Sequence, residues 1–477
     1  MSRKGGRAPA GGESAPAGKP RYQTGRAERL SYGVYAFGQM MFFMVISNFL
    51  QLYMTDSGIP VMVVGSVFIV AKVWDAVNDP LFGVIVDKTH FKSGKFIPWL
   101  RVSTFLIPAA TIVLFAMPSG ASLQVKTIWA AVAYMLWDTS YTICDVPIFA
   151  LATSMTDNQK ERDWLYLLNR LFMFIGGILV AALVPALYPA IGWTATAAII
   201  SVVAMATMAP VGFRAKERFF ARGERSPKVR ELARYLFKNR PLLVFNAVII
   251  IASLTNTSAA VVNYVAIYCL GGTQWISVLA LVMTAPMLVS IVLAKQLIKR
   301  FDKMAVCLAC MGVNLFLGVG MFFAGYQNTA LFLSIIAARA LLVSTAGVLV
   351  AMFTADCVEY GHFTSGERSQ GVAFSIQTFT AKLSGALSSA IAMFALGAAG
   401  FVSGEGAPQT AQTISWIWRL YTVIPVIAGL AAFLVLLVGY KLRDRDVVLM
   451  MRANAGELTR AEAEAGFSKA LGGAPIR

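Results

Sequence analysis

The sequence predicts an all-α polytopic membrane protein, and three observations support this fold class. Of the 477 residues, 57% are hydrophobic and only 14% are charged, whereas soluble domains are usually about 25% charged. Apolar runs of roughly 20 residues, the length that a helix needs to cross the hydrocarbon core, recur along the whole chain. Because these runs are continuous and do not alternate apolar with polar residues, the pattern excludes a β-barrel.

The apolar runs predict twelve transmembrane helices. In chain order these cover roughly 30–55, 61–86, 98–118, 126–155, 164–188, 193–212, 241–268, 275–298, 305–325, 330–360, 369–398 and 411–441. We therefore expect five segments: a tail over 1–28, a six-helix bundle over 29–212, a basic loop over 213–240, a second six-helix bundle over 241–441, and a C-terminal tail over 442–477. The first tail is rich in Gly, Pro, Ala and Arg, so disorder is expected there, and it lacks the apolar centre of a signal peptide.

Basic residues alternate between the gaps that separate the spans. They gather after the second and eighth spans and in the central loop, whereas 56–60, 189–192, 269–274 and 326–329 contain no Lys or Arg. By the positive-inside rule, both termini lie in the cytoplasm and the protein crosses the cytoplasmic, or inner, membrane several times. The formal charge of +17 therefore reflects topology and contact with the lipid bilayer, and we expect no nucleic-acid partner.

The second span carries charge where charge is expensive. Its sequence "AKVWDAVNDPLFG" places Lys72, Asp75 and Asp79 within the apolar run. Four residues separate the two acids, so they lie about 40° apart around a helix and about 6 Å along it. Two acids at this spacing repel, so we expect one to take up a proton or a cation to bind. Lys72 pairing with one acid as a structural salt bridge is the alternative, and it leaves the other acid unpaired.

The fourth span holds a second polar cluster, "WDTSYTICDVPIF". Asp138 and Asp145 are seven residues apart and share a helix face, with Tyr141 and Thr142 between them. Carboxylate and hydroxyl oxygens are hard ligands that suit an ion such as sodium. Phe149 follows one turn after Asp145 and could offer a ring face to a substrate, although packing is the commoner role of such a ring.

Basic side chains also lie inside two other spans. Arg170 in the fifth span and Lys382 in the eleventh are far from the span ends, so they cannot easily reach the headgroups. We expect Arg170 to pair with Asp145, and Lys382 to face the same cavity with Gln377 and Thr378. The acids would then remain short of positive partners until an ion binds. Two halves with repeated basic turns favour a transporter whose site lies between the bundles.

Three long motifs then resemble one family. The stretches "WDAVNDPLFGVIVDKT…GKFIPW", "YTICDVPIFALA…ER…NR" and "ADCVEYGHFTSGERSQGVAFSIQTFTAKLSGAL" are together similar to the glycoside–pentoside–hexuronide:cation symporters of the major facilitator superfamily. The resemblance spans 30–441. It implies the twelve-helix major facilitator fold, no enzymatic activity, no cofactor beyond a coupling Na⁺ or H⁺, and no bound metal apart from Na⁺.

Site residues follow from this resemblance by position. The cation would be bound by Asp75, Asp79, Asp145 and Thr142. The sugar or glycoside would contact Tyr141, Asp145, Phe149, Arg170, Gln377, Thr378 and Lys382. Independently of the resemblance, the charged residues of the spans and turns predict a charge network or gate that includes Lys72, Asp87, Lys88, Asp138, Asp356 and Glu359.

The chain also departs from the family pattern. A lysine and a sugar-holding acid in the first span of melibiose permease are replaced by Gln39 and Met40. Phe149 stands where that permease has tryptophan, and Asp138 stands where it has glycine. These changes argue against a galactoside substrate and leave room for a second cation or for proton coupling.

The sequence thus predicts a monomeric secondary transporter that brings a sugar or glycoside into the cytoplasm. Four alternatives remain open: the same fold carrying a lipid-like or amphipathic solute, an H⁺-coupled exporter, an intramembrane aspartyl protease, and a transport-inactive scaffold. No Gly-x-Gly-Asp stretch supports the protease.

Overall fold

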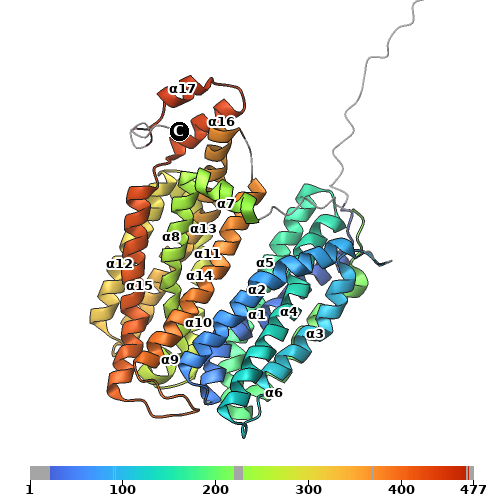
Figure 1. Cartoon of the computed structure of the whole chain (residues 1–477), viewed down its shortest axis with the longest axis vertical. Coiled ribbons are helices and arrows are strands. Elements are labelled where there is room, and N and C mark those ends of the chain that lie inside the picture. The colour runs from blue at the N-terminus through green and yellow to red at the C-terminus, as the bar shows by residue number, and fades with distance from the viewer. Residues whose placement is uncertain are drawn as a thin grey trace, which may run out of the picture.

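The computed structural model describes residues 22–89, 91, 93–219, 229–366, 370–468 and 471, without the side chains of 80, 87 and 229–233. These residues form helices and one isolated antiparallel bridge between Phe91 and Gly94. The helices gather into two bundles that lie side by side and are closest at one end (Figure 1). The predicted all-α polytopic fold is therefore confirmed.

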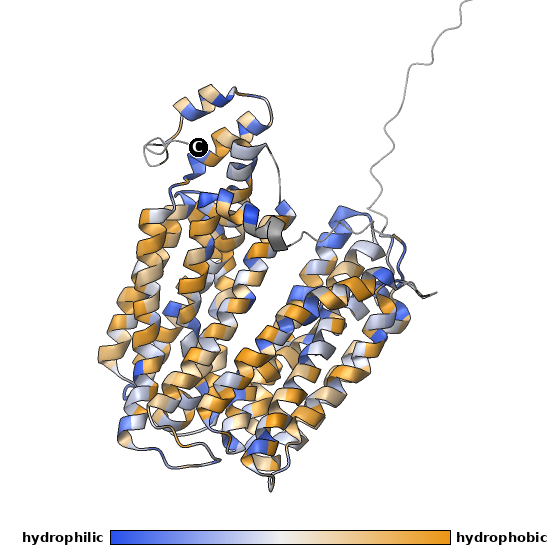
Figure 2. Cartoon of the chain, viewed as in Figure 1, coloured by the Kyte–Doolittle hydropathy of each residue, from blue (hydrophilic) through white to orange (hydrophobic). Residues whose placement is uncertain are grey.

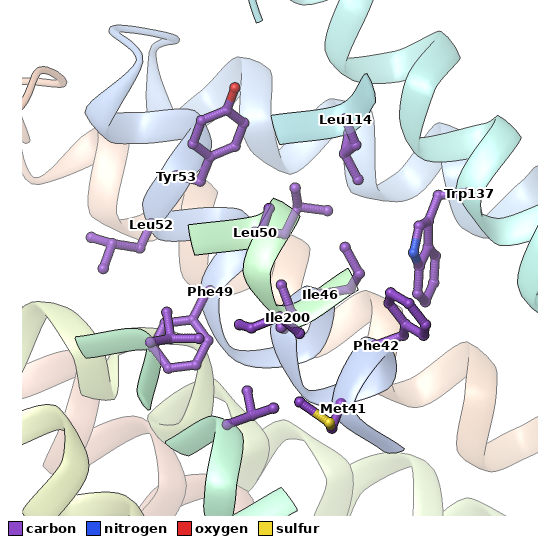
Figure 3. Packing of buried hydrophobic residues seen from close by; sticks show 14 of the residues in the cluster. Met41, Phe42, Ile46, Phe49, Leu50, Leu52, Tyr53, Leu114, Trp137 and Ile200 are labelled. Atoms are coloured by element: carbon purple, nitrogen blue, oxygen red, sulfur yellow. The ribbon is translucent and has the colours of Figure 1, made fainter. Parts of the chain in front are cut away.

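The N-terminal bundle is built around its first helix. Its members are α1 (Arg26–Asp56), α2 (Val61–Lys88), α3 (Ile97–Phe115), α4 (Leu123–Met155), α5 (Gln159–Ile191) and α6 (Trp193–Arg214). α1 packs against both α5 and α6, and its buried Phe42, Ile46 and Leu50 meet Leu114 of α3 and Ile200 of α6 in the apolar core (Figure 3). Burial of these side chains holds α1, α3 and α6 together.

Glycines set the closest contacts of α1. A Cβ atom at Gly176 of α5 would come within 2.5 Å of the carbonyl oxygen of Phe37, so the two helices touch backbone to backbone. Small residues allow this approach, which maximises packing between membrane helices. α5 then turns into α6 at the single residue Gly192, whose φ of +81° favours glycine.

The C-terminal bundle contains two interrupted spans. Its members are α8 (Arg240–Ser253), η1 (Leu254–Asn256), α9 (Thr257–Tyr264), η2 (Val265–Cys269), α10 (Gln274–Thr284), α11 (Pro286–Ile298), α12 (Lys303–Ala324), α13 (Thr329–Ser365), α14 (Gln370–Ala398) and α15 (Ala411–Gly439). The seventh predicted span is a 3₁₀-helix over η1, near its middle, and a π-helix over η2, at its end. The eighth is divided at Pro286, which has no N–H to continue the α-helical ladder.

Three short helices lie at one end of the C-terminal bundle. α7 (Val229–Lys238) lies in the predicted central loop, and α16 (Asp444–Asn454) and α17 (Arg460–Ala465) follow the last span (Figure 1). The predicted N-terminal tail ends earlier than residue 28, because α1 begins at Arg26 and the backbone N–H of Thr24 donates to Glu161 of α5 at 2.9 Å. Most of that tail, residues 1–21, lies outside the described residues.

Eleven helical segments of the described chain are long and apolar enough to cross a membrane, and Figure 2 shows apolar residues along their lengths. The predicted count of twelve is not reproduced by this criterion, because α4 is not among the eleven. α4 has 33 residues and packs along α2 and α3, so it has the length of a span. Its polar residues, among them Lys126, Asp138 and Asp145, account for its lower hydropathy.

The bundles join at the end that carries the turns 56–60 and 269–274, which we call the closed end. There, Tyr264 of α9 shares a hydrogen bond with Thr55 of α1 at 3.1 Å, and Asn263 donates to the carbonyl of Asn48. α2 and α14 also pack together, with Gly65 beside Met393. Of the hydrogen bonds between described residues of different bundles, only those of Lys382 lie far from this end.

Candidate functional site

A charged cluster lies where α2, α4 and α14 meet, at the middle of their lengths. α2 contributes Lys72, Asp75 and Asp79, and α14 of the other bundle contributes Lys382. Asp75 is 6% exposed, so the carboxylate has lost nearly all contact with water. A buried charge needs a partner to offset that loss.

Both acids of α2 have basic partners. Lys72 lies 3.3 Å from Asp75 Oδ2, and Lys382 binds Asp79 and lies 3.7 Å from Asp75 Oδ1. The prediction that these acids lack positive partners is therefore wrong for Asp75 and Asp79. The prediction fails because Lys382 belongs to α14 of the other bundle. The periodicity of one helix does not show which residues of another helix lie against it.

Thr142 of α4 extends the cluster with neutral oxygen and nitrogen groups. Its hydroxyl donates to Asp79 Oδ1 at 3.0 Å and accepts from Asn78 Nδ2 at 2.9 Å. Asn78 is buried and lies between the two acids in the sequence, but it was not among the predicted site residues. The Lys382 ammonium contacts carboxylate oxygens of Asp79 and Asp75, and Thr142 and Asn78 extend this polar set from the other oxygen of Asp79.

Asp145 is held by an amide and not by a cation. Gln39 of α1 donates from Nε2 to Asp145 Oδ1 at 3.0 Å and to the Tyr141 hydroxyl at 3.4 Å. Gln39 is fully buried and its Oε1 has no partner among the described residues. The sequence showed this position only as a departure from the family pattern, so its role as the partner of Asp145 was missed.

The predicted ion pair between Arg170 and Asp145 is not formed. Arg170 is exposed on α5 and makes no ion pair or hydrogen bond with another described residue. The neighbouring Asn169 is 1% exposed, and successive residues of a helix point about 100° apart. At this level of α5, Asn169 therefore lies on the face packed within the bundle and Arg170 lies on an exposed face.

Asp138 is the second acid without a cation within ion-pair distance. It is 7% exposed, and its Oδ2 has no hydrogen-bond partner among the described residues. With Asp145, it leaves the cluster with four aspartates against the two lysines Lys72 and Lys382. Negatively charged side chains therefore outnumber positively charged ones in this cluster.

Aromatic rings border the cluster on α4. Tyr141 stacks on Trp137 with ring centroids 5.0 Å apart and meets Phe43 of α1 at 6.0 Å. Phe149 is 41% exposed and has no aromatic partner among the described residues. A planar ring with a hydroxyl, such as Tyr141, offers both an apolar face and a polar group to a ligand.

The remaining predicted substrate residues are near Lys382 in sequence but are not joined to the cluster by hydrogen bonds between described residues. Thr378 is exposed and Gln377 is half-buried, and Oε1 of Gln377 has no partner among the described residues.

Of the residues predicted to form a charge network or gate, Lys72 and Asp138 lie in the charged cluster, and the other four lie at the end opposite the closed end. Asp356 of α13 binds Lys303 of α12 through both carboxylate oxygens, at 2.8 and 2.6 Å. Glu359 accepts from Asn454 of α16 at 3.1 Å, so both acids are engaged inside the C-terminal bundle. Lys88 is exposed, and the side chain of Asp87 lies outside the described residues.

Comparison with known proteins agrees with this architecture. The family model described as "MFS/sugar transport protein" matches residues 31–444, which include every span and every residue of the cluster. The chain belongs to this sugar transport family. Within the major facilitator superfamily, it is a member of the glycoside–pentoside–hexuronide symporters.

Relatives of this family member are identical to it at about a quarter of the aligned residues. The isoprimeverose transporter of Lactiplantibacillus pentosus is 28% identical over 86% of this chain and 88% of the relative. A putative sulfoquinovose importer of Salmonella typhimurium is 28% identical over 88% of this chain and 90% of the relative. The crystal structure of the nucleoside transporter NupG superimposes with a TM-score of 0.66 at 11% identity, over 86% of this chain and 99% of that one, and so supports the fold alone.

Among the described residues, no group of three or more His, Cys, Asp or Glu side chains is arranged to hold a metal ion.

Proposed function

We propose that this chain is a monomeric, cation-coupled symporter that carries a sugar or glycoside into the cytoplasm by alternating access. The coupling ion is Na⁺ or H⁺. Both termini lie in the cytoplasm, and the bilayer is the cytoplasmic membrane.

The observation that carries this proposal is the contact of Lys382 with Asp79 and Asp75. Lys382 belongs to one bundle and the two acids belong to the other. Its ammonium holds the position that a monovalent cation would take between these carboxylates, with Thr142 as a further oxygen ligand. A cation that binds there competes with Lys382 and so acts directly on the ion pairs that join α14 of one bundle to α2 of the other.

Coupling follows from linkage. If cation binding releases Lys382 and changes the arrangement of the bundles around the substrate, then the cation raises substrate affinity, and the substrate raises cation affinity by the same factor. The two aspartates without cations, Asp138 and Asp145, make the site favour positive charge further. Asp145 is held near Tyr141 by Gln39, which places the acid beside the ring that would meet the sugar.

The proposed direction of transport, like the solute class, rests on the relatives, which include an isoprimeverose transporter and a putative sulfoquinovose importer. The closed end supports the orientation in the membrane. Its turns, 56–60 and 269–274, contain no Lys or Arg, so by the positive-inside rule they lie outside the cell. With the bundles joined on the outer side, this conformation is the inward-facing one of the alternating-access cycle.

Uptake into proteoliposomes tests both the solute and the ion. Purified protein is reconstituted, a Na⁺ or H⁺ gradient is imposed separately, and α- and β-glycosides, pentosides and uronides are screened. We expect accumulation of at least one of these solutes above its external concentration under one gradient. Accumulation of an amphipathic lipid-like solute alone, or efflux driven by inward proton movement, would support the corresponding alternative.

The Asp79→Cys variant tests the cation site. Without this carboxylate the coupling cation loses a ligand and is not held at the site, so the ion gradient no longer drives uptake. We therefore expect the internal solute concentration to rise only to the external level. Asp163→Cys is the matched control, because Asp163 is exposed and forms no ion pair with a described residue. Full concentrative uptake by Asp79→Cys would refute the assignment.

A further inference from the structure

A cavity of about 480 Å³ lies outside the charged cluster, in the C-terminal bundle. Its walls come from the end of α11, the start of α12, α13 and α16, so it lies at the end of the span Gln274–Ile298. This is the level at which the hydrocarbon core meets the headgroups. Neither the transport mechanism nor the family comparison gives this cavity a role.

One part of the cavity wall is a neutralised ion network. Lys303 binds Asp356 at 2.6 Å and Asp444 at 3.3 Å. The same turn is joined to α16 by backbone bonds, because Lys303 N–H donates to Asp444 Oδ2 at 3.0 Å and Asp444 N–H donates to Asp302 Oδ2 at 3.0 Å. These contacts hold α16 against α12. They also pair both acids that line the cavity, Asp356 and Asp444, with Lys303.

Two further lysines of the wall have no acid to bind. Lys295 and Lys299 are exposed, and neither makes an ion pair with a described residue. Lys299 follows the last residue of α11 and keeps helical backbone angles. It is four residues after Lys295, so the two ammonium groups lie on the same side of the helix. A pair of unneutralised lysines beside a cavity attracts an anion that can bridge them.

The opposite wall is apolar. Val447, Val448 and Met451 of α16 line the cavity with Ile298 of α11. Val448 is 54% exposed and Met451 is 51% exposed, although α16 buries Met450 in the core beneath them. A free phosphate ion gains nothing from such a wall, whereas an acyl chain is stabilised by it.

We propose that this cavity binds an anionic phospholipid, with the phosphate between Lys295 and Lys299 and the glycerol end of an acyl chain against Val448 and Met451. The charge of the lysines selects an anionic headgroup. The apolar wall selects a lipid over a soluble anion. Because the cavity lies at the end of a span, a lipid of the surrounding bilayer can enter it.

Native mass spectrometry of the full chain in detergent tests the proposal with defined lipids. Phosphatidylglycerol is titrated against phosphatidylcholine of the same chain length, and bound lipid is counted. We expect the wild type to bind phosphatidylglycerol preferentially. The double variant Lys295→Gln/Lys299→Gln should bind it roughly thirtyfold more weakly, since each lysine near the surface contributes roughly fivefold to anionic lipid binding.

Lys216→Gln/Lys238→Gln is the matched control, because it removes two exposed lysines that do not line the cavity. Equal loss of phosphatidylglycerol binding in the two double variants would overturn the proposal, as would equal binding of phosphatidylcholine by the wild type. Recovery in Lys295→Arg/Lys299→Arg would support a phosphate bridge.

Two further measurements separate a lipid from a soluble anion. Val448→Asn/Met451→Asn keeps both lysines and removes the apolar wall, so we expect weaker phosphatidylglycerol binding. Inorganic phosphate at millimolar concentration should not displace the lipid. Displacement by inorganic phosphate, with no effect of the α16 variant, would identify a site for a soluble anion and contradict the lipid proposal.

Discussion

At the residue scale, Lys382 and Gln39 determine how the buried acids are compensated. Lys382 gives Asp79 a full positive charge, and Gln39 gives Asp145 only an amide dipole. Because a hydrogen bond to an amide offsets less of the cost of a buried carboxylate than an ion pair does, the two acids differ in how strongly they favour an added cation. Asp138, whose Oδ2 has no partner among the described residues, adds to the excess of negative charge.

The variant Lys382→Gln should lower stability by leaving Asp79 without its cation. We expect a loss of about 1–2 kcal/mol, less than for a fully buried pair, since 44% of the Lys382 side chain is exposed. Adding Asp79→Asn should recover part of this loss, because no unpaired charge remains. Thermal unfolding of the wild type, both single variants and the double variant in detergent measures the coupling, and strictly additive losses would show that the pair does not form.

Replacing Gln39 tests the amide that holds Asp145. Gln39→Leu removes the donor and leaves the acid and the Tyr141 hydroxyl without this partner, so we expect a loss of about 1–3 kcal/mol together with weaker substrate binding. Gln51→Leu is the matched control, because Gln51 is buried on the same helix and its side-chain amide forms no hydrogen bond with a described residue. Unfolding and substrate-binding measurements compare the two, and equal effects would contradict a special role for Gln39.

At the scale of elements, the close approach of α1 to α5 holds the N-terminal bundle around its site. α1 carries Gln39 and α4 carries Asp145, so a shift of α1 on α5 moves the amide relative to the acid. The backbone contact between Gly176 and Phe37 fixes that position more tightly than side-chain packing alone, because backbone atoms cannot change rotamer.

Adjacent glycines of α5 provide a direct test of this contact. Gly176→Ala places a methyl group 2.5 Å from the carbonyl oxygen of Phe37, whereas Gly177→Ala meets nothing nearer than 3.7 Å. We expect Gly176→Ala to cost about 1–3 kcal/mol, and Gly177→Ala to be neutral or to stabilise by up to about 1 kcal/mol through helix propensity. Thermal unfolding of both variants distinguishes them, and an equal response would mean that α1 and α5 do not touch in this way.

At the scale of the whole molecule, transport by alternating access requires the closed end to open. The contacts that would have to separate include those of Tyr264 and Asn263 with α1 and the packing of α2 on α14. Buried residues of both bundles also form one continuous apolar cluster at this end, among them Val64 of α2 and Met393 of α14. Opening the closed end must therefore separate part of a shared core.

A disulfide across the closed end should stop transport. A Cβ atom at Gly65 of α2 would lie 3.2 Å from the Cβ of Met393 on α14, close to the separation of about 3.5–4.5 Å that a disulfide needs. We expect oxidised Gly65→Cys/Met393→Cys to be inactive and to recover on reduction, as measured by uptake and by gel mobility. Each single variant serves as the control, and normal uptake by the cross-linked protein would rule out opening at this end.

Much of the fold could be predicted because it depends on local properties. The length and hydropathy of each run fixed the spans to within a few residues, as the bounds of α3 and α6 illustrate. The change of geometry in the seventh span was not predicted, since "ASLTNTSAAVVNYV" has no proline to mark a break. In the site, the polar residues of α2 and α4 were found because charge in an apolar run is conspicuous, whereas Asn78 and Gln39 are neutral and were missed.

The sequence by itself determined which residues the membrane must accommodate, in what order the spans follow, and that four aspartates lie within the second and fourth spans. Only the tertiary structure decided the partners. Lys382 and Asp79 are 303 residues apart, and Gln39 and Asp145 are 106 apart, so each contact depends on the rotation and packing of helices that meet only in the folded protein. Burial is encoded along one helix, but the pairing of charges is a property of the interface between helices.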